Sequence, residues 1–462
     1  MQKDIIDVEE ELSTAPVGRS HIGLGLILAL LTLFDGYDTF NPAYVIHYVR
    51  QPWGLSLERV GMLISSGLVG FLIGAAIHGT IADRIGRRIT LLGGLWITTL
   101  FSLLTALLAD SFLSYSVLRI LTGLGLGVLL PLSTTYINEL APRRVANTFA
   151  LWGVALGWAM GGAAAGLVGV FVTPHTGWTG LYWIGACSFL LIPFAHRLLP
   201  ESPRFALLHG RHEEVLQTLC KLRPPRAAFY RQAQILAAPK AGRVSAWNLL
   251  ERPYGRLSLA IWGTSFLSLF CIFGLSGWIP TLMQERGESF GSSFGFGAMM
   301  QVTSFIGALV CGHLVDRSST ARPWLCTWSL AGALSILALV CFEQHWVNLA
   351  ATAAAGFFII GGQFVLNNFT AASYPTRMRA SAVGMELAVG RLGAILGPFI
   401  GGTLQQSFGG QHIMLLAIAI AAFLAGCLVL LARASGSAAD LQREAAPSAG
   451  ESGSAPLAQH TP

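Results

Sequence analysis

The sequence predicts an all-α polytopic membrane protein, with twelve transmembrane helices arranged in two pseudo-symmetric six-helix halves. Composition is the first reason, because 53% of the 462 residues are hydrophobic and only 11% are charged, whereas soluble domains carry about 25% charged residues. The 53 glycines are the second reason, because small residues let helices pack closely within a membrane. The mean hydropathy of +0.60 excludes an ordinary soluble globule.

A third reason is the length of the apolar segments. Twelve runs of about 18 or more mostly apolar residues are long enough to cross a bilayer as helices. In chain order they cover residues 22–45, 60–82, 89–109, 114–137, 148–172, 178–199, 256–283, 294–315, 323–342, 346–373, 381–404 and 411–432.

A long polar stretch after the sixth run divides the twelve runs into two sets of six. It holds nine basic and four acidic residues, which is typical of a cytoplasmic linker with some amphipathic helix. The last residues of the chain are rich in Ala, Ser, Gly and Pro, a composition typical of disorder. We therefore expect a cytoplasmic N-terminal tail, a six-helix half, a cytoplasmic linker, a second six-helix half and a disordered cytoplasmic tail. Their predicted bounds are 1–20, 21–199, 200–255, 256–432 and 433–462.

The formal net charge of +6 does not indicate a nucleic-acid partner, because the basic residues are distributed as membrane topology requires. With a cytoplasmic N-terminus, three arginines lie outside (Arg50, Arg59 and Arg286) and two lie well inside the apolar runs (Arg119 and Arg391). All other Lys and Arg residues then lie in cytoplasmic segments or at the cytoplasmic ends of runs, which predicts that both termini are cytoplasmic. No cleavable signal peptide is expected, since the first twenty residues are acidic and the first apolar run carries carboxylates.

Nothing in the sequence predicts a metal site or a catalytic centre. Six of the seven cysteines fall in the apolar runs, and none has the spacing of metal ligands. No cluster of Ser, Cys or His with a base and an orienting group is visible, so an enzyme is not expected.

Two aspartates lie within the first apolar run, in the segment Leu33–Thr39. At about 1.5 Å per residue, Asp35 lies roughly 20 Å into a hydrocarbon core about 30 Å thick. Asp38 follows three residues later, on the same helix face. Carboxylates are costly at that depth, so we interpret both as carriers of a coupling proton. The alternative is a structural ion pair that pins the first helix.

Two arginines also lie within the apolar runs, and a guanidinium group suits bidentate capture of a carboxylate. Arg119 lies about two turns from the external end of the fourth run. For this residue, capture of a substrate and neutralisation of Asp35 or Asp38 are equally consistent with the sequence. For Arg391, near the middle of the eleventh run, we favour an anionic substrate. Its nearest acid in sequence, Glu386, is five residues away and off its helix face.

Four more side chains in the runs are candidates with an alternative each. Gln363 and Asn367 share a helix face and could hydrogen-bond a ring hydroxyl, although interhelical amide bonds explain them equally well. Tyr37 could stack on an aromatic ring or pack as an ordinary core residue. Glu386 lies about one turn inside the eleventh run, and we favour its snorkelling to the cytoplasmic interface over a second proton site.

One loop occurs twice in the chain. The segment Gly79–Arg88 follows the second run, and a degraded copy, Gly312–Arg317, follows the eighth. The first copy resembles the signature loop between helices 2 and 3 of the major facilitator superfamily of secondary transporters. The second copy stands where a duplicated transporter fold expects one. A further segment, Pro200–Phe205, resembles a motif shared with sugar porters.

Within that superfamily, the chain is similar to the aromatic acid:proton symporter family. The segment Asp35–Asp38 resembles the hallmark of that family in helix 1. Other stretches that agree are Arg119–Gly127, Asn138–Arg144, Tyr374–Arg379 and Gly390–Pro398. The resemblance covers about residues 20–435, and Glu386 stands at a position that is usually uncharged in this family.

The resemblance implies a cytoplasmic gate in the repeated loop. An aspartate beside a helix N-terminus is favoured by the helix dipole, and neighbouring arginines hold it by charge. A loop that only orients the protein would explain the arginines but not Asp83. Glu139, near the end of the fourth run, is a further charged residue at the membrane. The candidate gating residues are Asp83, Arg84, Arg87 and Arg88, with Asp316 and Arg317 as the weaker copy.

Together these features predict a proton-coupled secondary active importer (a symporter) of small aromatic carboxylates, such as hydroxybenzoate or benzoate, that works by rocker-switch alternating access. The expected partners are an aromatic monocarboxylate, protons and membrane lipid, with a proton gradient as the energy source and no cofactor. The resemblance also implies a bacterial cytoplasmic (inner) membrane. The nearest alternative is a proton-coupled porter for an aliphatic organic acid or a sugar. A non-transporting ligand sensor is a further alternative.

Overall fold

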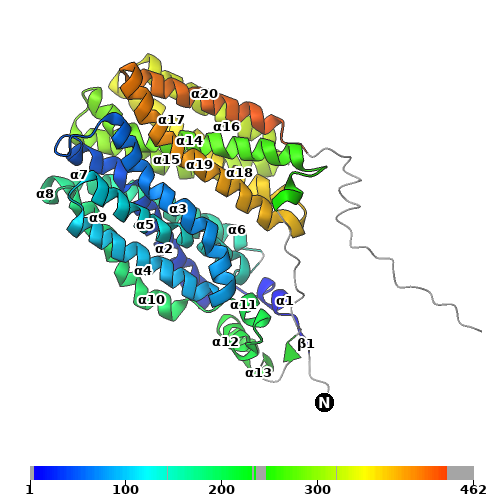
Figure 1. Ribbon diagram of the computed structural model, residues 1–462. Coiled ribbons are helices and arrows are strands. Elements are labelled where there is room, and N and C mark those ends of the chain that lie inside the picture. Colours follow the sequence, from blue (N-terminus) through cyan, green and yellow to red (C-terminus); the bar gives the residue numbers. More distant parts are fainter. Residues whose placement is uncertain (1–4, 143, 231–233, 236–245, 319, 434–462) are drawn as a thin grey trace, which may run out of the picture.

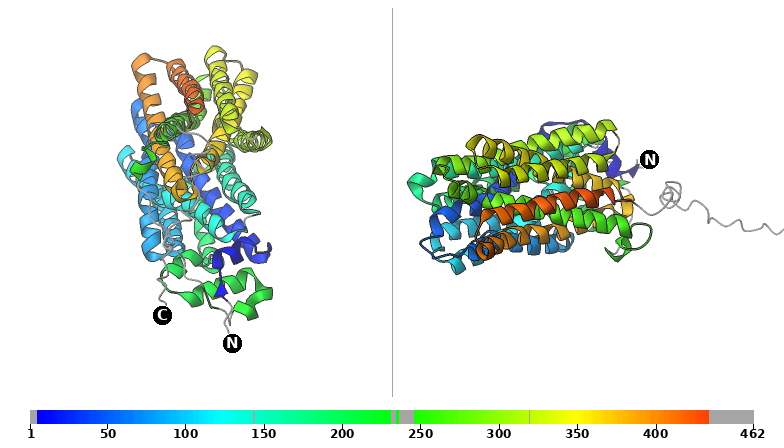
Figure 2. Two further views of the ribbon diagram at one scale, coloured as in Figure 1. Left: turned by 90° about the vertical axis from the view of Figure 1, so that its right-hand side faces the viewer. Right: turned by 90° about the horizontal axis from the view of Figure 1, so that it is seen from above.

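Twelve helices long and apolar enough to span a membrane make up most of the described chain, which confirms the predicted all-α fold class. The computed structural model describes residues 5–142, 144–230, 234–235, 246–318 and 320–433. Apart from its first residue, the predicted C-terminal tail lies outside these residues. The helices of both halves run along one long axis, with α1 (Val8–Ser13) at one end of the bundle (Figures 1 and 2).

The first half contains six spans, two of which are built from consecutive segments. They are α2 (Arg19–Val49), α3 (Leu57–Ile85), α4 (Arg87–Leu108), α5 (Phe112–Leu140), α6–η1–α7 (Ala146–Phe149, Ala150–Ala155 and Leu156–Phe171) and α9–η2–α10 (Thr179–Ala186, Cys187–Leu190 and Leu191–Leu198). The short helix α8 (Thr173–Thr176) connects the last two spans.

The second half also contains six spans. They are α14 (Gly255–Glu285), α15 (Phe290–Ser318), α16 (Ala321–Cys341), α17–η5–α18 (His345–Ala355, Gly356–Ile360 and Gly361–Ala372), α19 (Thr376–Phe408) and α20 (Gln411–Leu430). The fifth span of the first half and the fourth span of the second half each contain a π-helical turn, η1 and η5.

Glycines bring the helices within each half into backbone contact. A Cβ atom on Gly36 of α2 would lie 2.0 Å from the carbonyl oxygen of Trp158 in α7, and one on Gly161 of α7 would lie 1.9 Å from that of Leu33. Small residues are therefore obligatory where α2 crosses α7. This crossing fixes the depth and rotation of α2 at the position of its two aspartates.

The two halves meet along three pairs of helices: α2 with α14, α3 with α19, and α7 with α15. We call the end of the bundle that holds the start of α2 the N-terminal face, and the other end the opposite face. Polar contacts join the halves near the opposite face. Arg50 pairs with Glu285 at 3.1 Å, and the amide of Glu58 donates to Gln406 at 3.0 Å. Deeper in the bundle, Ser65 Oγ donates to a carbonyl of α19 at 2.7 Å.

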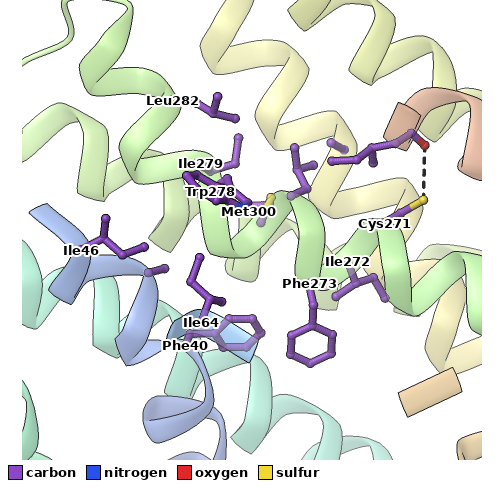
Figure 3. Packing of buried hydrophobic residues seen from close by; sticks show 14 of the residues in the cluster. Phe40, Ile46, Ile64, Cys271, Ile272, Phe273, Trp278, Ile279, Leu282 and Met300 are labelled. Carbon is purple, nitrogen blue, oxygen red and sulfur yellow. Dashed lines mark hydrogen bonds between the residues drawn. The ribbon is translucent and has the colours of Figure 1, made fainter. Parts of the chain in front are cut away.

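Between these contacts and the middle of the bundle, the halves share an apolar core. Phe40 of α2 and Ile64 of α3 belong to one buried cluster with Phe273 and Trp278 of α14 (Figure 3). The rings of Phe40 and Phe273 are stacked with their centroids 6.0 Å apart. Burial of such large side chains holds the halves together toward the opposite face.

A small folded unit lies against the first half at the N-terminal face, where the sequence predicted a tail and a linker. It contains β1 (Ile5–Ile6), α1 (Val8–Ser13), α11 (Pro203–Leu208), α12 (His212–Leu222), η3 (Pro224–Arg226), α13 (Ala227–Tyr230) and β2 (Gln234–Ile235). The two short strands pair in parallel. Further along the linker, the short helix η4 (Ala246–Leu249) contacts α19 of the second half. Ile6, Val8 and Leu12 are buried against α12, so part of the N-terminal segment is ordered by burial of its apolar face.

The carboxylate of Glu11 ties the N-terminal segment to the linker. It accepts a hydrogen bond from Arg226 at 2.5 Å and one from the Tyr230 hydroxyl at 2.6 Å, and it also pairs with Arg223. Burial raises the pKa of Tyr230 to about 12, so its hydroxyl stays protonated and donates to Glu11.

We expect Glu11→Ala to destabilise this unit. The change leaves the largely buried Arg223 and Tyr230 without their acceptor, which typically costs about 1 to 3 kcal/mol. Thermal unfolding of the purified protein in detergent measures the effect. Glu10→Ala on the exposed side of the same helix is the matched control. Equal midpoints for the two variants would show that Glu11 contributes nothing.

Candidate functional site

Asp38 and Arg119 form a buried ion pair inside the first half. Arg119 Nη1 lies 3.8 Å from Asp38 Oδ1, and its Nη2 donates to the backbone carbonyl of Asp38 at 2.7 Å. The Asp38 side chain also accepts from Ser102 of α4 at 3.3 Å and from Asn41 at 3.4 Å. Neither charged side chain is more than 1% exposed. Of the two possibilities that the sequence left open, the structure therefore favours neutralisation for Arg119.

Asp35 faces different partners from Asp38, although the two lie on adjacent turns. Its carboxylate is fully buried, and neither oxygen accepts a hydrogen bond within normal limits from the described residues. The charge of Arg391, from α19 of the second half, acts on it electrostatically. The Trp158 indole is also near it but does not form a hydrogen bond within normal limits. Asp35 thus lies within electrostatic range of a cation of the second half without forming a hydrogen bond to it.

Arg391 lies at the interface between the halves, with aromatic rings on its faces. Its guanidinium carbon is 3.8 Å from the ring centroid of Phe71 in α3 and 5.8 Å from that of Phe273 in α14. The side chain is 8% exposed. A guanidinium that stacks on a ring keeps its N–H groups at the edge of its plane, where a carboxylate can accept two of them.

Further aromatic rings from both halves pack against one another next to Arg391. Trp158 of α7 packs edge-on against Phe40 at 5.0 Å and against Phe364 of α18 at 6.2 Å. Phe40 in turn stacks on Phe273, which also contacts Arg391. The interface therefore combines one guanidinium with a set of aromatic rings, and we call this group of residues the interface site: Asp35, Phe40, Phe71, Trp158, Phe273, Phe364, Glu386 and Arg391.

Glu386 belongs to the same site, and its predicted position at the membrane surface is wrong. It is fully buried, and its Oε1 accepts hydrogen bonds from Ser265 of α14 at 2.5 Å and from Gln363 of α18 at 3.2 Å. Arg391 acts on it electrostatically, even though the two are five positions apart on α19. The reason is that α14 and α18 cover this turn of α19 and supply hydrogen-bond donors, so the carboxylate is satisfied inside the protein.

Of the remaining polar candidates, some lie at the interface site and one lies within the first half. Gln363 Nε2 lies 2.8 Å from the side-chain amide of Asn367, so both belong to the polar cluster around Glu386. Tyr37 lies instead within the first half, where its hydroxyl donates to the carbonyl of Leu181 at 2.9 Å. The structure does not bring Tyr37 or Arg119 to the interface site.

Phe40, Phe71 and Phe273 of the interface site were not predicted, and neither was Ser265, which donates to Glu386. The three phenylalanines lie within apolar runs of a chain with 26 phenylalanines, so nothing local distinguishes them. Ser265 is a single hydroxyl in an apolar run, where helical serines commonly bond to their own backbone. Their involvement depends on which helices meet, and one sequence does not contain that information.

The repeated loop forms a network at the N-terminal face of the first half. Arg87 pairs with Glu139 at the end of α5 at 3.0 Å and with Asp83 at 3.7 Å. Glu139 also accepts a hydrogen bond from Ser202. The predicted gating residues Arg87 and Asp83 are thus joined to Glu139, which the sequence left without a partner.

Glu201 completes this network and was not predicted to take part. Its Oε1 accepts from the backbone N–H groups of Arg87 at 2.9 Å and Arg88 at 3.2 Å, so it caps the N-terminus of α4. Gly86 precedes the helix at φ +103°, and a Cβ there would lie 2.4 Å from Glu201 Oε2. Arg88 also donates to a carbonyl of α10 at 2.5 Å. The other predicted gating residues are exposed: Arg84, Asp316 and Arg317.

We expect Arg119→Gln to destabilise the protein, and Asp38→Asn to restore part of the loss. The single change leaves a buried carboxylate without its cation, which typically costs about 3 to 5 kcal/mol. In the double variant both groups are neutral, so most of this cost disappears. Thermal midpoints of the four proteins measure the coupling. Additive losses would contradict the pairing role of Arg119.

The fold and this site define a class of membrane protein in which two six-helix halves enclose buried charges at their interface. Among the described residues, no group of three His, Cys, Asp or Glu side chains could hold a metal ion. A small pocket lies elsewhere, within the second half, and its lining includes Thr264, Cys271 and Phe358 but no charged side chain.

Comparison with known proteins identifies the family. The model of the Major Facilitator Superfamily matches residues 26–342 and 298–459. A gallate transporter of Pseudomonas putida is 32% identical over 92% of this chain and 94% of its own length. A 4-hydroxybenzoate transporter of Pseudomonas aeruginosa is 31% identical over 92% of this chain and 95% of its own. The chain belongs to the major facilitator superfamily, whose members are transporters rather than enzymes.

These relatives also confirm the resemblance to aromatic acid transporters that the motifs indicated. Among solved structures, a bacterial homologue of the human lysosomal transporter Spinster superposes with a TM-score of 0.71. The alignment covers 90% of this chain and 98% of that one at 16% identity, which shows the shared fold alone. The chain is thus an integral membrane protein of the transporter fold predicted from the repeated loop.

Proposed function

We propose that the protein is a proton-coupled importer of small aromatic carboxylates, such as hydroxybenzoate or benzoate. It works by alternating access in a bacterial inner membrane, with both termini in the cytoplasm. The observation that carries the proposal is Arg391: a buried guanidinium at the interface site, 3.8 Å above a phenylalanine ring and beside a second one.

This arrangement matches both parts of an aromatic acid. The edge of the Arg391 guanidinium binds the carboxylate through two charge-assisted hydrogen bonds. Phe40, Trp158, Phe273 and Phe364 offer faces and edges to a ring. The relatives named for gallate, 4-hydroxybenzoate and 3-(3-hydroxy-phenyl)propionate support this substrate class. A sugar has no anionic group that the buried guanidinium could bind, so we favour an acid.

Coupling follows from competition for the same cation. Ionised Asp35 interacts with Arg391 across the interface and thereby links the two halves. A proton on Asp35 removes this attraction and frees Arg391 for the carboxylate of the substrate. The halves then move about the loaded site, and the proton and substrate leave on the other side. Asp38 keeps Arg119 as its partner throughout, so it positions α2 rather than carrying a coupling proton.

The contacts between the halves suggest which state the structure represents. The ion pair of Arg50 and Glu285, the bond from Glu58 to Gln406 and the shared apolar core all lie toward the opposite face. With cytoplasmic termini, this face is external, so the state is one closed to the outside. The network of Arg87, Asp83 and Glu139 lies wholly within the first half, at the cytoplasmic end.

Uptake of radiolabelled 4-hydroxybenzoate and benzoate into proteoliposomes tests the proposal, with and without an inward proton gradient. Accumulation that depends on the gradient supports the symport of aromatic acids. Protein-free vesicles control for passive entry of the undissociated acid. Binding without flux would instead indicate a sensor, and no uptake in tight vesicles would redirect the search to aliphatic acids and sugars.

A further inference from the structure

Glu386 is a second carboxylate at the interface site, and the proton-coupling step described above does not use it. It is fully buried, and only Oε1 accepts hydrogen bonds, from Ser265 and Gln363. Its other oxygen, Oε2, is buried and has no hydrogen-bond partner among the described residues. A proton can therefore be added to Oε2 without breaking the bonds to Oε1.

Two helices bring charges to the surroundings of Glu386. Its own helix α19 contributes Arg391, and α2 contributes Asp35, which acts on the same arginine. The helices α14 and α18 contribute only the neutral groups of Ser265, Gln363 and Asn367. One guanidinium is thus shared by two carboxylates. In the empty protein each acid has the charge of Arg391 nearby, and Glu386 has two hydrogen-bond donors in addition.

Binding of an anionic substrate changes this balance. A carboxylate that takes the N–H groups of Arg391 deprives Asp35 and Glu386 of the same cation at the same time. If one of them stayed ionised, the loaded site would carry an uncompensated negative charge in a buried environment, which is costly. With a proton on each, one cation and one substrate anion remain, and the site is neutral.

We propose that Glu386 is a second proton-coupling residue, so that two protons enter with each aromatic carboxylate. The inference rests on the proposed function, because it requires that Arg391 bind the substrate. In each cycle, one external proton binds Asp35, another binds Glu386, and the anion binds Arg391. All three leave on the cytoplasmic side, and the empty protein returns with both acids ionised. One net positive charge therefore moves inward per substrate.

The two acids differ in what their protonation does. Asp35 lies across the interface from Arg391, so its charge holds the halves together, whereas Glu386 is on the same helix as Arg391. Asp35 therefore controls whether the halves can move. Glu386 sets how many protons accompany the substrate.

The proton-to-substrate ratio of purified protein in liposomes tests this inference directly. Uptake of 4-hydroxybenzoate is measured against proton uptake, and separately with a potassium diffusion potential, inside negative, at equal pH. We expect a ratio of two for the unchanged protein, with accumulation that rises tenfold for about every 59 mV of potential. In Glu386→Gln we expect a ratio of one, slower uptake driven by a pH gradient, and no response to the potential. Glu213→Gln, at an exposed position of α12, controls for the substitution itself.

Each outcome separates this inference from the proposed function. A ratio of one in the unchanged protein, with no response to potential, overturns the second proton but leaves the symport of aromatic acids intact. A ratio of two that persists in Glu386→Gln excludes Glu386 as its carrier. If Glu386→Gln does not fold, the ratio of the unchanged protein still decides whether a second proton enters with the substrate. Absence of any aromatic acid uptake by the unchanged protein overturns both proposals.

Discussion

Asp35→Asn is expected to abolish uphill uptake of aromatic acid while leaving exchange of substrate across the membrane. Asparagine has the shape of a protonated aspartate but cannot release a proton. The electrostatic link between Asp35 and Arg391 is then absent in every state, and the halves can move whether or not the site is loaded. Protons could then enter without substrate, and this leak would dissipate the gradient that drives uptake, although Glu386 can still bind and release a proton.

Two measurements on proteoliposomes separate coupling from folding. Accumulation of 4-hydroxybenzoate against its gradient should fall to the equilibrium level in Asp35→Asn. Exchange of external labelled for internal unlabelled substrate should continue, because Arg391 remains free to bind it. Asp110→Asn, at an exposed position between α4 and α5, serves as the control. Unchanged accumulation in Asp35→Asn would exclude the coupling role, and loss of exchange as well would assign Asp35 a structural one.

Much of the fold could be predicted because the requirements for crossing a membrane apply to each segment separately. Each span must bury its own backbone polar groups, so length and apolarity of a run are sufficient to find it. The repeated loop then placed the runs in a known two-half arrangement. The folded unit around Glu11 was harder to predict, because its residues are charged and its order depends on partners more than 200 positions away.

The candidate site was predicted only in part, for a similar reason. Depth in the membrane can be counted along one helix, so Asp35, Asp38, Arg119 and Arg391 were visible as unusual charges. Their pairing depends on helix rotation and on neighbours from the other half. Asp35 and Asp38 are three residues apart, yet one interacts with the second half and the other with α5 of the first.

The environment of Glu386 also could not be predicted from its own helix. Counted along α19, it lies near a membrane surface, and a charge there usually reaches water. Instead, Ser265 and Gln363 from two other helices meet its carboxylate and keep it inside. Which groups cover one turn of a helix is a property of the tertiary packing, and no pattern within α19 reveals it.

Replacement of Arg391 should have the largest effect on substrate binding of any single change. Arg391→Gln removes the only cation that the described residues place at the interface site, and it leaves Asp35 and Glu386 without a counter-charge. Loss of one partner of a buried, hydrogen-bonded charge pair costs about 2 to 5 kcal/mol, or roughly 30-fold or more in affinity. We therefore expect uptake at the level of empty liposomes.

Arg391→Lys distinguishes charge from geometry. The ammonium keeps the positive charge for both acids, but it lacks the flat fork that binds a carboxylate through two bonds and stacks on Phe71. We expect protein of near-normal stability with an affinity for 4-hydroxybenzoate lowered at least tenfold. Calorimetric titration in detergent measures binding separately from transport, and Arg256→Lys, at an exposed position of α14, is the matched control.

The substrate itself provides the complementary test of what Arg391 binds. The methyl ester of 4-hydroxybenzoate keeps the ring and the hydroxyl but has no carboxylate. If Arg391 binds the carboxylate, the ester should compete poorly with the unchanged protein, and its weak affinity should be the same in Arg391→Lys. If 4-hydroxybenzoate binds the Arg391→Lys protein as tightly as it binds the unchanged protein, its carboxylate binds elsewhere. The buried guanidinium would then be only the counter-charge that keeps two membrane-embedded acids ionised.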